Sequence, residues 1–132
     1  MTDYLPFTIH GTIVRGSRQA TRLGFPTANL DSLPDAPLSH GVYTGTATCQ
    51  PFFIETPCIV FYGKPYTLDT NTDIRFEAHI INVSLPDLYG KTMTVTLANY
   101  IRPNQQFINV DELQKAIKKD ITCSLASYKA LA

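Results

Sequence analysis

The sequence predicts a mainly β fold, an antiparallel barrel closed by one C-terminal helix. Several short stretches rich in β-branched and aromatic residues are separated by Gly- and Pro-containing turns, as strands of an antiparallel sheet are. No helical pattern lies between these stretches, although a parallel sheet would need one. A helical period appears only at the end of the chain, over about residues 111–130. The 132 residues are expected to form a single domain.

About five or six strands are expected. The fourth clear stretch alternates, with Ile74, Phe76, Ala78 and Ile80 on one face and Arg75, Glu77 and His79 on the other. The segment 22–30 (RLGFPTANL) contains Gly, Pro and Asn and is predicted to be a turn that ends a strand. The clear stretches are 7–16, 42–53, 56–63, 74–83 and 93–102.

The C-terminal segment has the spacing of an amphipathic helix. Its apolar residues recur at intervals of three and four, and Asp111 is a plausible N-cap. We expect this helix to lie as a lid or flank on the barrel. The apolar positions are Leu113, Ala116, Ile117, Ile121, Leu125 and Tyr128.

Composition and charge exclude several classes of protein. Lys plus Arg and Asp plus Glu number 11 each, so no basic excess indicates a nucleic-acid partner. Cys49, Cys58 and Cys123 form no CxxC pair, which argues against zinc and for a reducing compartment. The N-terminus does not resemble a signal peptide, and no apolar run approaches the roughly 20 residues needed to span a bilayer. We expect a cytosolic monomer that binds neither nucleic acid nor membranes.

Glu77 is the most informative acidic residue. On sequence alone, a solvent-facing carboxylate paired with Arg75 or His79 is the leading interpretation. The functional alternative is a carboxylate at the barrel mouth, where partial burial would raise its pKa and suit it to act as a general base. His79 is more often a satisfied surface histidine than a catalyst. Three histidines without ligand spacing make a transition-metal site improbable.

A phosphate site is possible in the segment before residue 30. No P-loop motif occurs. The loop between Gly16 and Gly24 carries Arg18 and Arg22, which could meet phosphates, although a solvated loop is equally expected. In the following turn, Thr27 and Asn29 offer the neutral oxygen ligands that magnesium accepts, and they would suffice if a nucleotide supplied further ligands.

Taken together, these motifs resemble the riboflavin kinase family, which includes stand-alone flavokinases and the C-terminal module of bacterial bifunctional FAD synthetases. The resemblance runs from about Phe7 to Tyr128. It rests on motifs in the family's order: GTIVRG, LGFPTANL, GVYTG, KPY, FEAHII, DLYGK and YIRP. The resemblance implies a six-stranded antiparallel Greek-key barrel with a C-terminal helix, and transfer of phosphate from ATP to riboflavin to give FMN and ADP.

The resemblance also implies roles for individual residues. Thr27 and Asn29 would coordinate the magnesium of MgATP, and Glu77 would act as general base on the 5′-hydroxyl of riboflavin. The nucleotide would lie against residues from the loop, the turn and DLYG: Gly16, Arg18, Arg22, Gly24, Pro26, Thr27 and Tyr89. The flavin would lie against the segment TVTLANYIR, at Val95, Leu97, Tyr100 and Arg102.

Two other functions stay open at this stage. The loop SRQATR has Ala20 and Thr21 where the family carries Gly and a basic residue, which favours a flavin- or nucleotide-binding barrel with weakened catalysis. A barrel that serves only in protein interaction is the third possibility. The combination of Thr27, Asn29 and Glu77 counts against it.

Overall fold

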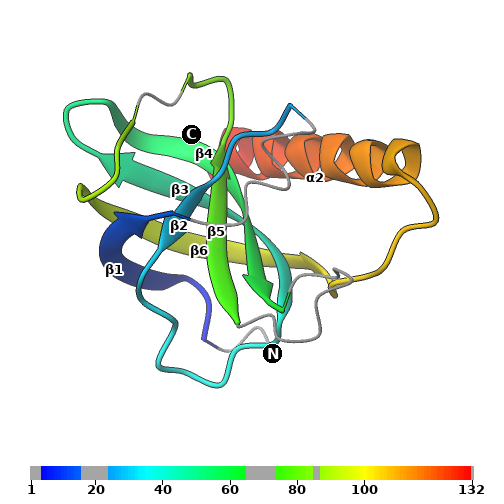
Figure 1. Cartoon of the computed structure of the whole chain (residues 1–132), viewed down its shortest axis with the longest axis horizontal. Helices are drawn as coiled ribbons and strands as arrows, with labels where there is room; N and C mark the ends of the chain where they lie inside the picture. The colour runs from blue at the N-terminus through cyan, green and yellow to red at the C-terminus, as the bar shows by residue number, and fades with distance from the viewer. Residues whose placement is uncertain (1–3, 16–23, 65–73, 85–86, 132) are drawn as a thin grey trace.

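Every strand pairing in the structure is antiparallel, and the strands close into a barrel (Figure 1). The structure is a computed structural model that describes residues 4–15, 24–64, 74–84 and 87–131. Its elements are β1 (Phe7–Val14), β2 (Ala28–Leu30), β3 (Gly41–Cys49), β4 (Phe53–Gly63), β5 (Arg75–Ile80), β6 (Thr92–Arg102) and α2 (Val110–Leu131). The order around the barrel is β1-β2-β5-β4-β3-β6, and β6 pairs back with β1. The predicted barrel of six antiparallel strands with a C-terminal helix is confirmed.

Alternation along the strands divides the barrel into a packed interior and an outer face. In β5 the side chains of Phe76, Ala78 and Ile80 are buried in the core, as the alternating pattern predicts. Glu77 and His79 occupy the alternate positions and therefore point to the outer face. Their chemistry is thus available outside the barrel and not within its interior.

Several strand boundaries differ from the sequence prediction, and one strand was not predicted. The turn that contains Pro26 runs directly into β2, a strand of three residues that the pattern analysis did not assign. The predicted strand 42–53 is instead β3, a turn and the first residue of β4. The backbone N–H of Phe52 donates to the carbonyl of Cys49 across that turn at 2.8 Å. Three residues are too few for a periodic signal, so β2 is defined by its pairing with β1 and β5.

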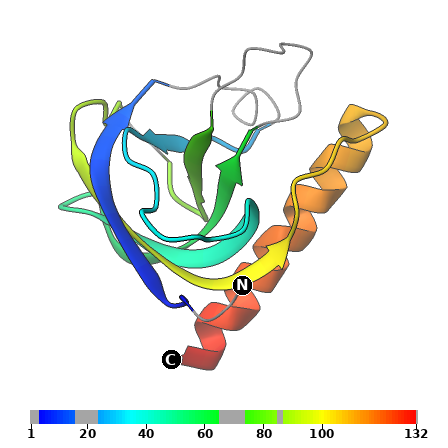
Figure 2. The ribbon, with the colours of Figure 1, turned by 90° about the horizontal axis from the view of Figure 1, so that it is seen from below.

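Helix α2 lies along the outer face of β3 and β4 (Figure 2). Ile117 is buried at this contact. The hydroxyl of Ser124 donates to the carbonyl of Cys58 at 2.7 Å, and the side chain of Asn99 donates to the hydroxyl of Ser127 at 2.6 Å. The helix is therefore attached to the barrel by polar contacts as well as by its apolar stripe.

The helix begins one residue earlier than expected. The carboxamide oxygen of Asn109 accepts a hydrogen bond from the backbone N–H of Glu112 at 2.9 Å, so Asn109 is the N-cap. The prediction of Asp111 as the cap is wrong, because Asp111 lies in the first turn of the helix. An acidic residue there is still favourable beside the positive end of the helix dipole.

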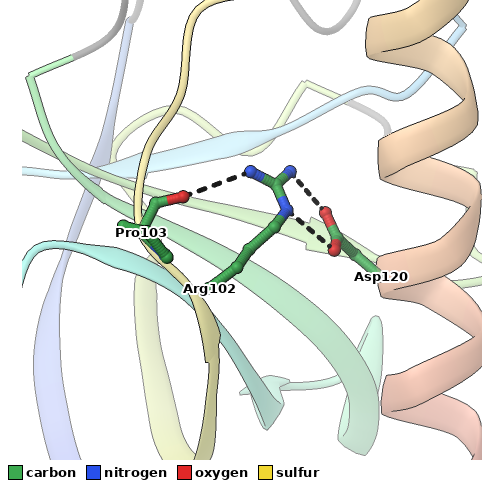
Figure 3. A network of polar contacts seen from close by, with 3 residues as sticks. All are labelled: Arg102, Pro103 and Asp120. Carbon is green, nitrogen blue, oxygen red and sulfur yellow. Dashed lines mark hydrogen bonds and ion pairs between the residues drawn. The ribbon is translucent and has the colours of Figure 1, made fainter.

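An ion pair joins the end of β6 to the middle of α2 (Figure 3). The guanidinium of Arg102 donates two hydrogen bonds to the carboxylate of Asp120, at 3.1 and 2.7 Å. It also donates to the carbonyl of Pro103 at 3.4 Å and lies 5.6 Å from the centre of the Phe107 ring. Asp120 is 2% exposed, so this ion pair is part of the interface between helix and barrel.

Within the residues described above, no helix has the length and apolarity needed to cross a bilayer.

Candidate active site

Strand pairing brings Asn29 and Glu77 together. The two residues lie opposite each other in the β2–β5 ladder, and the carboxamide nitrogen of Asn29 donates to a carboxylate oxygen of Glu77 at 2.9 Å. Two residues that are 48 positions apart in the sequence, and that the motifs singled out separately, therefore form one polar pair. Asn29 is buried and Glu77 is partly buried.

The environment of Glu77 suits a base. Burial raises the pKa of its carboxyl above the ordinary value of 4.5, and the positive charge of Arg75 opposes that shift. Arg75 lies two residues before Glu77, on the same face of β5. No ion pair within 4 Å joins the two residues in the described part of the chain. The carboxylate is therefore a stronger proton acceptor than a solvated glutamate.

Thr27 and Asn29 fit a magnesium site that a nucleotide would complete. Because a carboxylate only accepts hydrogen bonds, the Asn29 nitrogen faces Glu77, and no described residue donates a hydrogen bond to its amide oxygen, which could therefore bind a cation. Among the described residues, nothing hydrogen-bonds the hydroxyl of Thr27, which lies two positions before Asn29. The same ranges contain no cluster of three His, Cys, Asp or Glu that could hold a metal. Such a sparse set of neutral oxygens suits magnesium, which keeps several waters and takes phosphate oxygens.

His79 supports the turn that carries Thr27 and leads into β2, where Asn29 lies. Its ring nitrogen Nδ1 lies 2.7 Å from the carbonyl oxygen of Pro26, and its ring packs edge-to-face on Phe25 with centroids 5.7 Å apart. His79 is 8% exposed, and burial lowers the pKa of its imidazole. The prediction of an ordinary surface histidine is wrong, because the turn of residues 24–27 covers the ring.

The turn of residues 87–90 lies beside the end of β1 that neighbours Asn29. The N–H of Gly90 donates to the carbonyl of Ile13 at 2.9 Å, which holds the turn of residues 87–90 against the end of β1. The guanidinium of Arg15 lies 4.5 Å from the centre of the Tyr89 ring. Because Val14 pairs with Asn29 and Arg15 follows Val14 directly, this cation–π pair lies just beyond the end of β1, the strand next to β2.

The nucleotide residues predicted from the sequence are only partly covered by the structure. Gly24, Pro26 and Thr27 lie in the turn that leads into β2, and Gly24 has φ +92°, a conformation that favours glycine. Gly16, Arg18 and Arg22 lie outside the described residues. The turn leads into β2, which pairs with β5, where Glu77 lies, and with β1, whose end is bonded to the turn that carries Tyr89.

Comparison with known proteins identifies the family. The family model for flavokinase (riboflavin kinase) matches residues 4–127. The chain belongs to the riboflavin kinase family.

Individual riboflavin kinases agree with this assignment. Human riboflavin kinase is 34% identical over 124 residues, covering 89% of this chain and 78% of the human protein. The bifunctional riboflavin kinase/FMN adenylyltransferase of Mycoplasma pneumoniae is 38% identical over 117 residues, and the match covers 88% of this chain but 40% of that protein. The crystal structure of riboflavin kinase from Trypanosoma brucei has the same fold, with a TM-score of 0.70 and 22% identity over 92% of this chain and 76% of that one.

Riboflavin kinases must also bind a flavin, and the predicted flavin residues divide into two groups. Val95 and Leu97 are 0% exposed and pack in the barrel interior, so their side chains form part of the core, and their contact with the flavin stays a prediction. Tyr100 packs edge-to-face on Tyr43, and its hydroxyl donates to the carbonyl of His40 at 3.3 Å. Arg102 faces α2 and is paired with Asp120. The alternation of β6 predicts the inward position of Val95 and Leu97, because every second side chain of a strand points to the same face.

Two contributors to the site were missed by sequence reasoning. Arg15 follows β1 directly, and the sequence analysis predicts no site role for it, although a basic residue beside the predicted loop is a usable signal. For Phe25 the sequence predicts only a place in the turn. Its contact with His79 joins segments 54 residues apart and has no local sequence signal.

Proposed function

We propose that this chain is an ATP:riboflavin 5′-phosphotransferase, which converts riboflavin and MgATP to FMN and ADP. Membership of the riboflavin kinase family supplies the reaction class. The observation that supports the proposal for the site is the hydrogen bond between Asn29 and Glu77, which joins the proposed base to a proposed magnesium ligand.

Glu77 is the proposed general base. Its carboxylate accepts the proton of the riboflavin 5′-hydroxyl while the hydroxyl oxygen forms a bond to the γ-phosphorus of ATP. The bond between that phosphorus and the oxygen bridging to the β-phosphate breaks, and ADP leaves with the bond's electron pair. Raising the pKa of this carboxyl brings it closer to the working pH, which makes proton acceptance more effective.

Thr27 and Asn29 would hold magnesium through the threonine hydroxyl and the free amide oxygen. When bound, the ion supplies positive charge that offsets the negative charge of the phosphates. Because both proposed ligands are neutral, the protein does not itself reduce that charge. The hydrogen bond to Glu77 fixes the Asn29 amide and so orients its oxygen.

The remaining site assignments stay predictions from the sequence. They place ATP against Gly16, Arg18, Arg22, Gly24, Pro26, Thr27 and Tyr89, and the flavin against Val95, Leu97, Tyr100 and Arg102. The cytosolic location and the monomeric state are predictions of the same kind.

The test is a direct assay of product. Purified protein is incubated with riboflavin, ATP and magnesium, and FMN is separated by chromatography. Glu77→Gln keeps the size of the side chain and an oxygen that can accept from Asn29, and we expect kcat to fall by about 10²–10⁴-fold. Glu112→Gln is the control, because Glu112 lies on the exposed first turn of α2.

The outcomes separate the candidate functions. Riboflavin binding without FMN formation would support the flavin-binding barrel in place of the kinase. An equally fast Glu77→Gln variant would refute the assignment of the base while leaving the kinase activity in place.

A further inference from the structure

His79 is a buried histidine close to the proposed chemistry that the proposed mechanism does not use. It follows Glu77 by two residues, so both side chains lie on the outer face of β5. Its Nδ1 is 2.7 Å from the carbonyl oxygen of Pro26. Pro26 directly precedes Thr27, the residue proposed to bind magnesium.

The hydrogen bond determines which ring nitrogen carries a proton. A carbonyl oxygen can only accept, so Nδ1 of His79 must donate. This holds for the neutral ring and for the charged ring alike, because both can carry a proton on that nitrogen. The edge-to-face contact with Phe25, at an interplanar angle of 89°, holds the ring from a second direction.

The hydrogen bond between His79 and Pro26 lies just beyond the last paired residues of β2 and β5. Ala28 and Ala78 are the last paired residues of β2 and β5 on this side. One position further out, Thr27 would face His79, but β2 begins only at Ala28. The imidazole bridges this gap and holds the turn to β5 from the residue before Thr27.

Holding this carbonyl limits the conformations open to Thr27. The carbonyl of Pro26 and the nitrogen and Cα of Thr27 lie in one rigid peptide plane. The proline ring already fixes φ of Pro26 near −65°, so its ψ is the main remaining freedom of that plane. A bond that fixes the carbonyl direction therefore fixes ψ of Pro26 and, with it, the direction in which Thr27 leaves the plane.

We propose that His79 is a positioning residue, which aims the side chain of Thr27 at the site beside Glu77 by holding the Pro26 carbonyl. Two bonds then bracket Thr27, His79 to Pro26 on one side and Asn29 to Glu77 on the other. The function of Thr27 as a ligand rests on the proposed function, whereas its fixed direction does not.

Two substitutions of nearly equal polarity test the geometry. His79→Asn places an amide nitrogen the same number of bonds from the backbone as Nδ1, and His79→Gln places it one bond further out. We expect His79→Asn to stay within about threefold of wild type, and His79→Gln to lose about 10–100-fold in kcat/KM for MgATP, the range typical of residues that orient a metal ligand. His10→Gln is the matched control, because its Nδ1 also makes a hydrogen bond, at 2.8 Å to Thr94, on the exposed outside of β1.

The hydrogen bond between His79 and Pro26 can also be examined directly, in the protein alone, without metal or nucleotide. Nitrogen-15 NMR of the wild-type imidazole should show the proton on Nδ1 of His79. The amide signal of Thr27 should shift and exchange faster with solvent in His79→Gln, but not in His79→Asn or His10→Gln.

These results distinguish failure of the inference from failure of the proposed function. An unprotonated Nδ1 in the wild type, or equal activity and equal Thr27 signals in His79→Asn and His79→Gln, would overturn the positioning role. If Thr27→Ala leaves the magnesium dependence of FMN formation unchanged, the ligand assignment fails. The NMR result would still decide whether His79 fixes the turn.

Discussion

Replacing Arg102 with methionine is expected to lower the free energy of unfolding by about 3–5 kcal/mol at pH 8, as removal of one member of a buried ion pair does. Arg102 makes two charge-assisted hydrogen bonds to Asp120, at 3.1 and 2.7 Å. Bonds of this kind contribute about 1.5–3 kcal/mol each. The Asp120 carboxylate is 2% exposed, so water does not replace the missing guanidinium, while methionine keeps much of the apolar packing of the arginine stem.

The loss of stability in Arg102→Met should depend on pH, because a protonated Asp120 is neutral and no longer an unpaired buried charge. Burial raises the pKa of Asp120 in the wild type, although the hydrogen bonds and charge of Arg102 lower it. Removing Arg102 raises that pKa further above the unfolded value of about 3.9. A group with a raised folded pKa adds stability at low pH and loses it as pH rises through that pKa. The destabilisation should therefore grow between about pH 5 and pH 8.

Urea unfolding followed by circular dichroism at both pH values measures this difference. Lys115→Met is the control, since its ion pair with Glu112 spans 3.5 Å between side chains that are 74% and 52% exposed. That substitution should cost less than about 0.5 kcal/mol at either pH. A loss below about 1 kcal/mol for Arg102→Met at pH 8, or the same loss at pH 5 and pH 8, would refute the reasoning.

Three further predictions concern the site and the barrel. Arg75→Gln removes the charge that lowers the pKa of Glu77, so the acidic limb of the kcat/KM profile should move to higher pH, whereas Arg75→Lys should leave it in place; an unmoved limb in both would contradict the electrostatic role of Arg75. Glu77→Gln should raise the thermal unfolding midpoint at pH 8 more than at pH 4, because the raised pKa of Glu77 makes its ionisation destabilising as pH rises; an equal effect at both pH values would contradict this. Gly45→Ala should destabilise the barrel by about 1–3 kcal/mol in urea unfolding, because the new Cβ would lie 2.3 Å from the carbonyl oxygen of Thr96 in β6; a neutral substitution would contradict the close approach of the two strands.

Much of the fold could be predicted from local patterns. The alternation of residues 74–80 correctly placed Phe76, Ala78 and Ile80 in the core, although Ile74 is 38% exposed and His79 is buried. The helical period gave α2 to within one residue at each end. β2 could not be predicted in this way, because a strand of three residues is defined by its partners and not by its own period. The buried Asp120 and Ser124 were missed for a similar reason. Their polar groups are satisfied by Arg102 and by the carbonyl of Cys58, which lie far away in the sequence.

The sequence could predict which residues belong to the candidate site, but not which of them contact one another. The motifs named Thr27, Asn29 and Glu77, and the ladder register joins the last two. The role of His79 depends on a bond across 53 residues, so the local alternation indicated only that it faced outward. The resemblance implies flavin contacts at Val95 and Leu97, which no observation tests, whereas β6 alternation predicts their place in the core.

The return of β6 to β1 has a consequence for how the chain folds. Phe7 pairs with Leu97, so the barrel can close only after almost the whole β-sheet sequence has been synthesised. Contacts between residues so distant in the chain slow folding, typically to milliseconds or seconds for barrels of this kind. Until β6 arrives, the edges of β1 and β3 are unpaired and open to other chains. The growing polypeptide is therefore most exposed to aggregation in the interval just before residues 92–102 emerge.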